Sequence, residues 1–398
     1  MSAETTPARR ARLAGTCAMT LVLAAGAIAL PAAPAHAADP ITAAEQPFFS
    51  YYHLDQARAK GYTGKGMTIA LLDGEVDTSV PELAGATVID KTPCTVTSGA
   101  SSKSHGTAMA SLLVSKEYGV APDATLLAYR TNYIKQGDKA ESDCQGHHGN
   151  NLDEPEWLIN QAITDGAQII SISATNGQVS DSLKWAIARA NALGVIVVSG
   201  AGNDNEESTI DSYGKWSGVV SVSAIDTSGK RAEYSSWGKG VTVAAVGGPM
   251  VAYDFETGTN INTQGTSNAT PLVAGFLALA KQKWPNATSN QLLQLLTKTA
   301  LNNEGQWNKY TGYGVAAIGP MLNTDPSQYP DENPIMDKGN DLGPTNEETQ
   351  QYLAGLVDPR DVAGDSTYTY RGIDESILKD TDIPTPIHLG TSPRYHAK

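Results

Sequence analysis

The chain contains the stretch Gly265-Thr266-Ser267-Asn268-Ala269-Thr270-Pro271, which an apolar run follows as far as Leu279. This pattern predicts a buried helix with Ser267 at its N-terminus. Free backbone N–H groups and the positive end of the helix dipole favour negative charge there, and a tetrahedral acyl-transfer intermediate carries such a charge. A serine in this position is more often a plain N-cap, so a catalytic role depends on the residues that accompany it.

Three further polar residues lie at the ends of predicted strands and helices. An apolar strand ends at Asp73, an apolar helix begins near His105, and a buried strand runs into a Gly-rich turn that ends at Asn203. Catalytic groups of open α/β sheets gather at the carboxyl ends of the strands. The chain order Asp, His, Ser is the order of the catalytic triad in subtilisin. Each residue alone has an ordinary structural interpretation, but together they predict one active site.

The motifs around these residues resemble those of the subtilisin-family (subtilase) serine peptidases. His105-Gly106-Thr107 and the Gly265–Pro271 stretch resemble the family's His and Ser signatures, and Gly202-Asn203 resembles its oxyanion-hole segment. The resemblance extends from about Gln46 to about Leu322. It implies an α/β fold, a subtilisin-like three-layer sandwich with a mainly parallel central sheet and helices on both faces.

The resemblance also implies a role for each of these residues in a serine-type endopeptidase. Ser267 is the expected nucleophile, His105 the general base and then acid, and Asp73 the group that orients the imidazole. The Asn203 side chain and the backbone N–H of Ser267 are expected to bind the oxyanion. The family builds a substrate-binding strand near residue 173, which gives these candidate substrate-binding residues: Ser173, Ala174, Thr175 and Gly202.

The sequence departs from the family pattern next to the triad. Gly74 and Glu75 follow the expected catalytic aspartate where the family usually has Ser or Thr and then Gly. Asn268 replaces a methionine that usually follows the serine. The carboxylate of Glu75 either raises the proton affinity of His105 or points to solvent. These departures leave every proton-transferring group in place and bear on substrate preference and pH dependence.

The N-terminal residues predict secretion, because three arginines precede an apolar stretch that ends in a small-x-small site. Residues 1–37 are therefore a predicted signal peptide that is cleaved after Ala37. Removal of this segment leaves two cysteines, Cys94 and Cys144. In an oxidising compartment such a pair predicts one disulfide, and two free thiols are the alternative.

The charge balance excludes some partners. The whole chain carries a formal net charge of −14. Because residues 1–37 hold three arginines and one glutamate, the remainder carries −16. This balance argues against binding to nucleic acid or to an anionic membrane after signal cleavage. We expect a polypeptide substrate, a monomer, no cofactor and no metal. His147 and His148 are adjacent and point in different directions, so they are interpreted as loop residues.

Apolar runs alternate between strand and helix lengths along the chain, which predicts a parallel sheet with helices on both faces. Strands are predicted at 67–72, 125–129, 168–172, 195–198, 219–225 and 241–246, and helices at 105–115, 154–165, 180–193, 270–283 and 288–300. The predicted organisation is a short N-terminal extension over 38–47, the peptidase domain over 48–322, a linker over 323–346 and an acidic polar tail over 347–398. The tail is predicted to be largely disordered and dispensable for activity, and a docking tail is the alternative.

Two other functions remain compatible with the sequence. The first is a catalytically inactive extracellular scaffold or binding protein on the same fold. The second is a dedicated maturation peptidase for one secreted partner, because 173–177 departs from the family's usual Ser-Leu-Gly.

Overall fold

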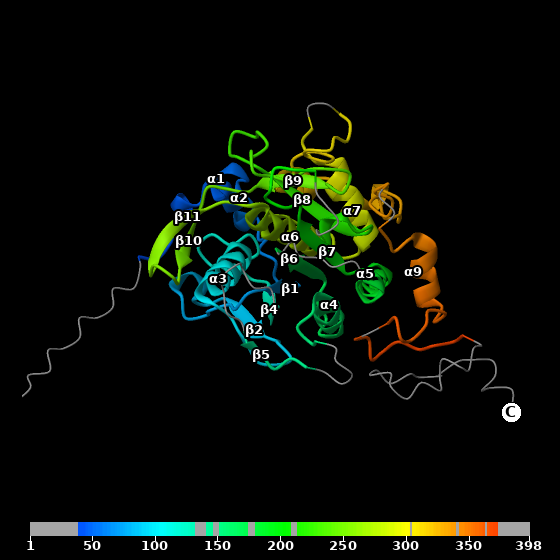
Figure 1. Cartoon of the computed structure of the whole chain (residues 1–398). Helices are drawn as coiled ribbons and strands as arrows, with labels where there is room; N and C mark the ends of the chain where they lie inside the picture. The colour runs from blue at the N-terminus through cyan, green and yellow to red at the C-terminus, as the bar shows by residue number, and fades with distance from the viewer. Residues whose placement is uncertain are drawn as a thin grey trace, which may run out of the picture. The chain divides into compact units, whose positions relative to one another are not determined.

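A seven-stranded parallel sheet forms the centre of the fold, in the order β2-β4-β1-β6-β7-β8-β9 (Figure 1). The structure is a computed structural model that describes residues 39–131, 141–145, 151–173, 180–207, 213–302, 305–339, 342–362 and 364–372. In sheet order the strands are β2 (Thr87–Asp90), β4 (Thr125–Arg130), β1 (Thr68–Asp73), β6 (Ile169–Ile172), β7 (Ile196–Gly200), β8 (Val219–Ile225) and β9 (Val243–Val246). Six of these strands occupy the predicted runs. β2 was not predicted, because it is an edge strand with mostly exposed side chains and no apolar run.

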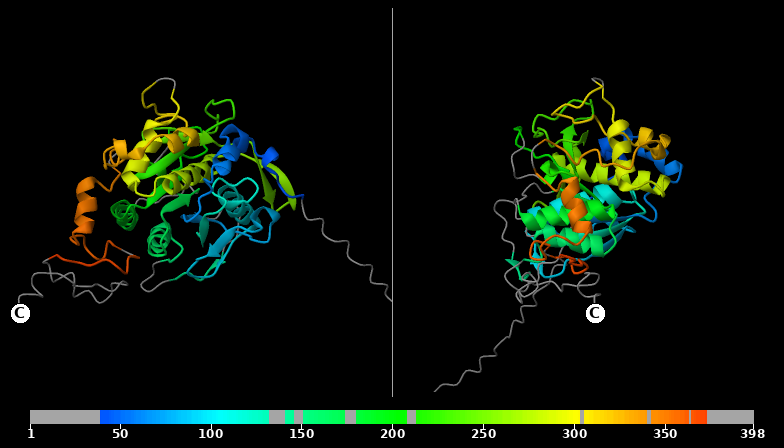
Figure 2. Two further views of the ribbon diagram at one scale, coloured as in Figure 1. Left: turned by 180° about the vertical axis from the view of Figure 1, so that it is seen from behind. Right: turned by 90° about the vertical axis from the view of Figure 1, so that its right-hand side faces the viewer.

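Both faces of the sheet are buried. Along β1, Ile69 and Leu71 join one apolar cluster, whereas Ala70 and Leu72 join another. The first cluster includes residues of α3 (Ala100–Val114), α6 (Thr266–Lys283) and α7 (Ser289–Lys298). The second includes residues of α4 (Pro155–Thr164) and α5 (Asp181–Leu193). The sheet therefore lies between two helical layers, and the predicted α/β three-layer sandwich is confirmed (Figure 2).

Smaller elements complete the architecture. An antiparallel hairpin of β10 and β11 lies beside α3, and β3 and β5, which are far apart in the chain, form a second two-stranded antiparallel sheet. The bounds of these strands are Met250–Asp254, Thr259–Thr263, Val96–Thr97 and Glu141–Ser142. The remaining α-helices are α1 (Pro47–Tyr51), α2 (Leu54–Ala59), α8 (Ile318–Asn323) and α9 (Asn346–Leu353). The predicted N-terminal extension packs on this body, because Ile41 is buried and its backbone N–H donates to Glu82 Oε1 at 2.9 Å.

The C-terminal segment, residues 324–372, corrects the prediction of a linker and a disordered tail. Its buried side chains form an apolar cluster with Trp185 and Ala188 of α5. The members contributed by the segment are Tyr352, Val357, Val362, Tyr368 and Tyr370. Helix α9 lies beside α5 in both views (Figures 1 and 2). The described part of the segment is therefore part of the folded body; residues 373–398 lie outside the described residues.

Polar contacts also hold this segment. Lys338 is half-buried, and its Nζ atom donates to the carbonyls of Gly214, Val219 and Gly240 at 2.6, 2.5 and 3.0 Å. Asp365 forms a buried ion pair with Arg189 of α5, with an N–O distance of 3.3 Å. A sequence-based search for apolar periodicity does not detect such anchors, because each is a single polar residue whose partner lies far away in the chain.

Candidate active site

A cleft of about 460 Å³ contains the residues predicted for catalysis, Asp73, His105, Asn203 and Ser267, among its lining. Asp73 is the last residue of β1, Asn203 follows β7, and Ser173 follows β6. The carboxyl ends of these neighbouring strands thus meet at the cleft, as expected for a parallel sheet. The β10–β11 hairpin supplies a further wall.

Asp73 and His105 are in direct contact. The Asp73 Oδ1 atom lies 2.7 Å from His105 Nδ1 and also accepts a hydrogen bond of 2.7 Å from the backbone N–H of Gly74. The Asp73 side chain is buried, whereas that of His105 is 35% exposed. The second oxygen, Oδ2, has no hydrogen-bond partner within the described part of the chain. Because Nδ1 faces the carboxylate, the opposite ring nitrogen, Nε2, is the atom that can exchange a proton in the cleft.

The glycine after His105 has a steric reason. A Cβ atom at Gly106 would lie 2.4 Å from the carbonyl oxygen of Gly74 and 2.8 Å from that of Glu75. A side chain here would push α3 away from the residues that follow β1. Gly106 therefore permits the close approach that brings His105 to Asp73.

Ser267 is the second residue of α6 and exchanges two hydrogen bonds with Ser173. The Ser267 hydroxyl donates to the Ser173 carbonyl at 3.1 Å, and the Ser173 hydroxyl donates to the Ser267 carbonyl at 3.1 Å. In a regular helix the N–H of residue 271 would bond the carbonyl of residue 267, but Pro271 has no N–H. Pro271 thus frees the Ser267 carbonyl, which accepts the hydrogen bond from Ser173.

Asn203 is held by the residue before the serine. Its Oδ1 atom accepts hydrogen bonds from the Thr266 backbone N–H at 2.8 Å and from the Thr266 hydroxyl at 3.1 Å. This leaves Nδ2 as the donating end of the amide. A Cβ atom at Gly265 would lie 3.5 Å from Asn203 Nδ2 and 3.6 Å from the backbone N of Ser267. The lack of a side chain at Gly265 therefore keeps the space between these two donors open.

The remaining predicted site residues are placed only in part. Ser173 lies beside Ser267. Gly202 has a φ of +108°, a backbone conformation that residues with a side chain rarely adopt. Ala174 and Thr175 lie outside the described residues. Sequence reasoning missed Thr266, although its position in the Gly-Thr-Ser motif was the available signal.

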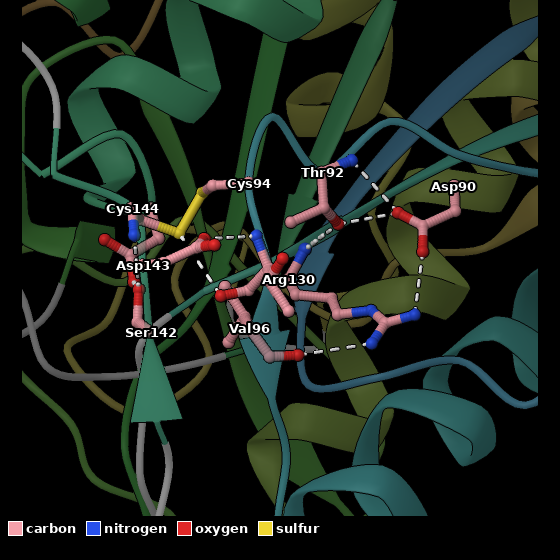
Figure 3. The surroundings of a disulfide bond; sticks show 10 residues. Asp90, Thr92, Cys94, Val96, Arg130, Ser142, Asp143 and Cys144 are labelled. Carbon is pink, nitrogen blue, oxygen red and sulfur yellow. Dashed lines mark hydrogen bonds and ion pairs between the residues drawn. A yellow bond between two sulfur atoms is a disulfide. The ribbon is translucent and has the colours of Figure 1, made fainter.

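The structure forms a disulfide between Cys94 and Cys144, with a Cα–Cα distance of 5.1 Å (Figure 3). The bond links the segments that carry β3 and β5, and Thr95 N–H donates to Asp143 Oδ1 at 2.7 Å beside it. Arg130, the last residue of β4, donates to the carbonyl of Val96 at 3.2 Å. The disulfide loop therefore contacts the strand adjacent to β1.

Comparison with known proteins agrees with this geometry. The model of the Subtilase family matches residues 64–314, which is more than half of the chain. The chain belongs to the subtilase family. It is 32% identical over 259 residues to a thermostable alkaline protease of Halalkalibacterium halodurans, covering 63% of this chain and 66% of that protein. It is 29% identical over 265 residues to subtilisin E of Bacillus subtilis, with shares of 63% and 65%.

A solved structure resembles this subtilase as well. Fervidolysin from Fervidobacterium pennivorans, described as a keratinolytic enzyme related to subtilisin, matches with a TM-score of 0.57 and 27% identity. The match covers 72% of this chain and 46% of that one. The chain spans just under two thirds of the length of the two curated relatives. In the described residues, no helix combines the length and apolar character needed to cross a membrane.

Proposed function

We propose that this subtilase is a serine endopeptidase that hydrolyses peptide bonds in polypeptide substrates through an acyl-enzyme intermediate. The observation that supports this proposal most directly is the 2.7 Å contact between Asp73 Oδ1 and His105 Nδ1 in the cleft that also holds Ser267. Family membership supports the same reaction class.

The proposed reaction has two stages. Ser267 Oγ turns from the Ser173 carbonyl and attacks the substrate carbonyl, while its proton passes to Nε2 of His105. Collapse of the tetrahedral intermediate breaks the C–N bond, and His105 donates that proton to the leaving amine. Water then attacks the acyl-enzyme by the same route and releases the acid. Asp73 holds the imidazole in one tautomer and stabilises the imidazolium.

Two donors are assigned to the oxyanion. The Asn203 Nδ2 atom and the Ser267 backbone N–H flank the open space beside Gly265. Thr266 fixes the Asn203 amide before the reaction starts, so little reorganisation is needed when charge develops. Loss of one such donor typically costs about 2.7–4 kcal/mol of transition-state stabilisation.

We also propose that the protein is secreted and that residues 1–37 are removed, although they lie outside the described residues. The Arg-rich start and apolar stretch support a signal peptide, and the Cys94–Cys144 disulfide fits an oxidising compartment. N-terminal sequencing of the secreted protein tests this, because Ala38 should be its first residue. An uncleaved N-terminus on active secreted protein would contradict the proposal.

The test of the reaction compares wild-type protein with two serine variants. Mass spectrometry of blocked peptides and of denatured casein should show internal cleavage by the wild type. Ser267→Ala should abolish this cleavage and keep the fold, because only the attacking oxygen is lost. Ser228→Ala is the matched control, since Ser228 lies in an exposed turn, and its activity should equal the wild type's. Cleavage by the Ser267→Ala protein at the wild-type rate would refute the proposal.

A further inference from the structure

Glu75, the first carboxylate after β1, is paired with two basic side chains. Its Oε2 atom accepts a hydrogen bond from Arg130 Nη1 at 3.2 Å, and its Oε1 atom lies 3.5 Å from Lys103 Nζ. Lys103 Nζ also lies 2.7 Å from Asp77 Oδ2, and Arg130 Nη2 lies 2.8 Å from Asp90 Oδ2. We call these five residues the charge cluster.

The charge cluster is built on the same elements as the catalytic pair. Glu75 is two residues beyond Asp73, and Lys103 is two residues before His105 on α3. Arg130 is the direct register partner of Asp73 across the β1–β4 ladder. The side chains of Glu75, Lys103 and Arg130 are each about a quarter exposed, at 25–27%. Each of the three residues therefore lies within two positions of Asp73 or His105 along the chain or directly across the β1–β4 ladder, and its charge is only partly screened by water.

Acidic side chains also contact His105 or line the cleft beside it. Asp73 contacts the imidazole from β1. From the hairpin side, Asp254 accepts a hydrogen bond from Ser104 at 3.1 Å, and Glu256 lines the cleft. Asp77 is paired with Lys103. Because negative charge favours the imidazolium, an unpaired Glu75 would hold the histidine protonated, in the form that does not act as a base.

We propose that Lys103 and Arg130 are positioning residues that hold the Glu75 carboxylate and neutralise its charge, so that His105 remains a neutral base to a lower pH than it otherwise would. This inference rests on the proposed function, since it concerns the same histidine. Glu75, which departs from the family pattern and takes no part in the proposed reaction steps, thereby gains a role.

The test is the pH dependence of kcat/KM, whose acid limb reports titration of the essential base in the free enzyme. Arg130→Met should raise the midpoint of the acid limb by about 0.3–0.6 pH unit at low salt, as expected for one nearby unit charge in a partly aqueous environment. Lys103→Met should shift it in the same direction. In 1 M salt the shift should shrink, because the Debye length falls to about 3 Å.

Glu75→Gln provides the test of sign. Alone, it removes a negative charge and should lower the midpoint. Combined with Arg130→Met, it should return the midpoint to the wild-type value. Lys116→Met is the matched control, because Lys116 pairs with the exposed Asp123 and its substitution changes net charge equally. The control should leave the midpoint within about 0.1 pH unit.

A second measurement separates this inference from the proposed function. NMR titration of the His105 imidazole in the Ser267→Ala background reports the same midpoint without requiring any cleavage. A shift by NMR, together with wild-type protein that does not cleave peptides, would support the electrostatic role and contradict only the proposed function. An unchanged midpoint in folded Arg130→Met and Lys103→Met proteins, with kcat lowered equally at all pH values, would refute the inference.

Discussion

Substitution of Asp365 by alanine tests whether the C-terminal segment belongs to the folded body. Its side chain is fully buried and lies 3.3 Å from Arg189, whose own side chain is 3% exposed. Arg189 also donates to the Asn160 carbonyl at 2.9 Å and to the Thr164 hydroxyl at 3.1 Å. Asp365→Ala would leave a buried guanidinium without its counter-charge, and the Tyr352 hydroxyl would lose its carboxylate acceptor.

We expect Asp365→Ala to lower the free energy of unfolding by about 3–5 kcal/mol, the usual cost of removing one partner from a buried ion pair. The melting temperature should fall by roughly 6–20 °C, at 2–4 °C per kcal/mol. Chemical and thermal denaturation should be measured in the Ser267→Ala background, which removes self-digestion. Combined substitution with Arg189→Met should recover part of the loss, since no unpaired charge remains.

Asp358→Ala is the matched control for this prediction. Asp358 pairs with Arg360, whose side chain is 53% exposed, so its loss should cost at most about 1 kcal/mol. Equal and small effects of the two substitutions would refute the docking of the segment. These contacts reverse the expectation that the C-terminal residues are dispensable: a chain that ends near Asn323 should be destabilised.

Three further predictions concern the oxyanion site and two stabilising contacts. Asn203→Ala should lower kcat by roughly 10²–10³ with little change in KM, because the oxyanion exists only after attack; steady-state kinetics on one peptide would decide this, and an effect confined to KM would count against the role. Replacement of Cys94 and Cys144 by serine should lower the unfolding free energy by up to about 4 kcal/mol, given the sequence separation of 50, and denaturation curves that match the wild type's would be inconsistent with a stabilising bond. Lys338→Met should cost at least about 1–3 kcal/mol, since three buried carbonyls lose their donor. Burial lowers the pKa of Lys338 from 10.5 to about 7, so between these pH values the unfolded chain binds one more proton than the folded chain. The unfolding free energy of the wild type should therefore rise from pH 7 to 10.5. The Lys338→Met variant should lack this rise, and identical pH profiles of the two proteins would contradict the prediction.

The sequence predicted the parts of the fold that apolar runs encode. The strands that hold Asp73 and precede Asn203 are buried on both faces, so nearly every residue is apolar and the run is visible. The helix after Ser267 is visible for the same reason. The motif residues then followed from their positions at the ends of these runs.

The rest could not be predicted because it depends on pairs that are close only in space. Lys338 and Asp365 have polar neighbours in the sequence, which is typical of a solvated chain. In the structure, however, Lys338 binds backbone carbonyls and Asp365 binds an arginine on α5. Glu75 could be placed near the catalytic aspartate from its number alone. Its pairing with Lys103 and Arg130 could not be predicted, because it depends on the register of β1 with β4 and on where α3 begins.

Labelling with a fluorophosphonate tests the assignment of Ser267 as the nucleophile, because this reagent captures only an activated serine. One label per folded chain is expected, mapped by mass spectrometry to Ser267. His105→Ala should slow labelling by at least about 10³-fold, since the hydroxyl would lack its base. No label on folded wild-type protein, or a label on another serine, would contradict the assignment of Ser267 as the nucleophile.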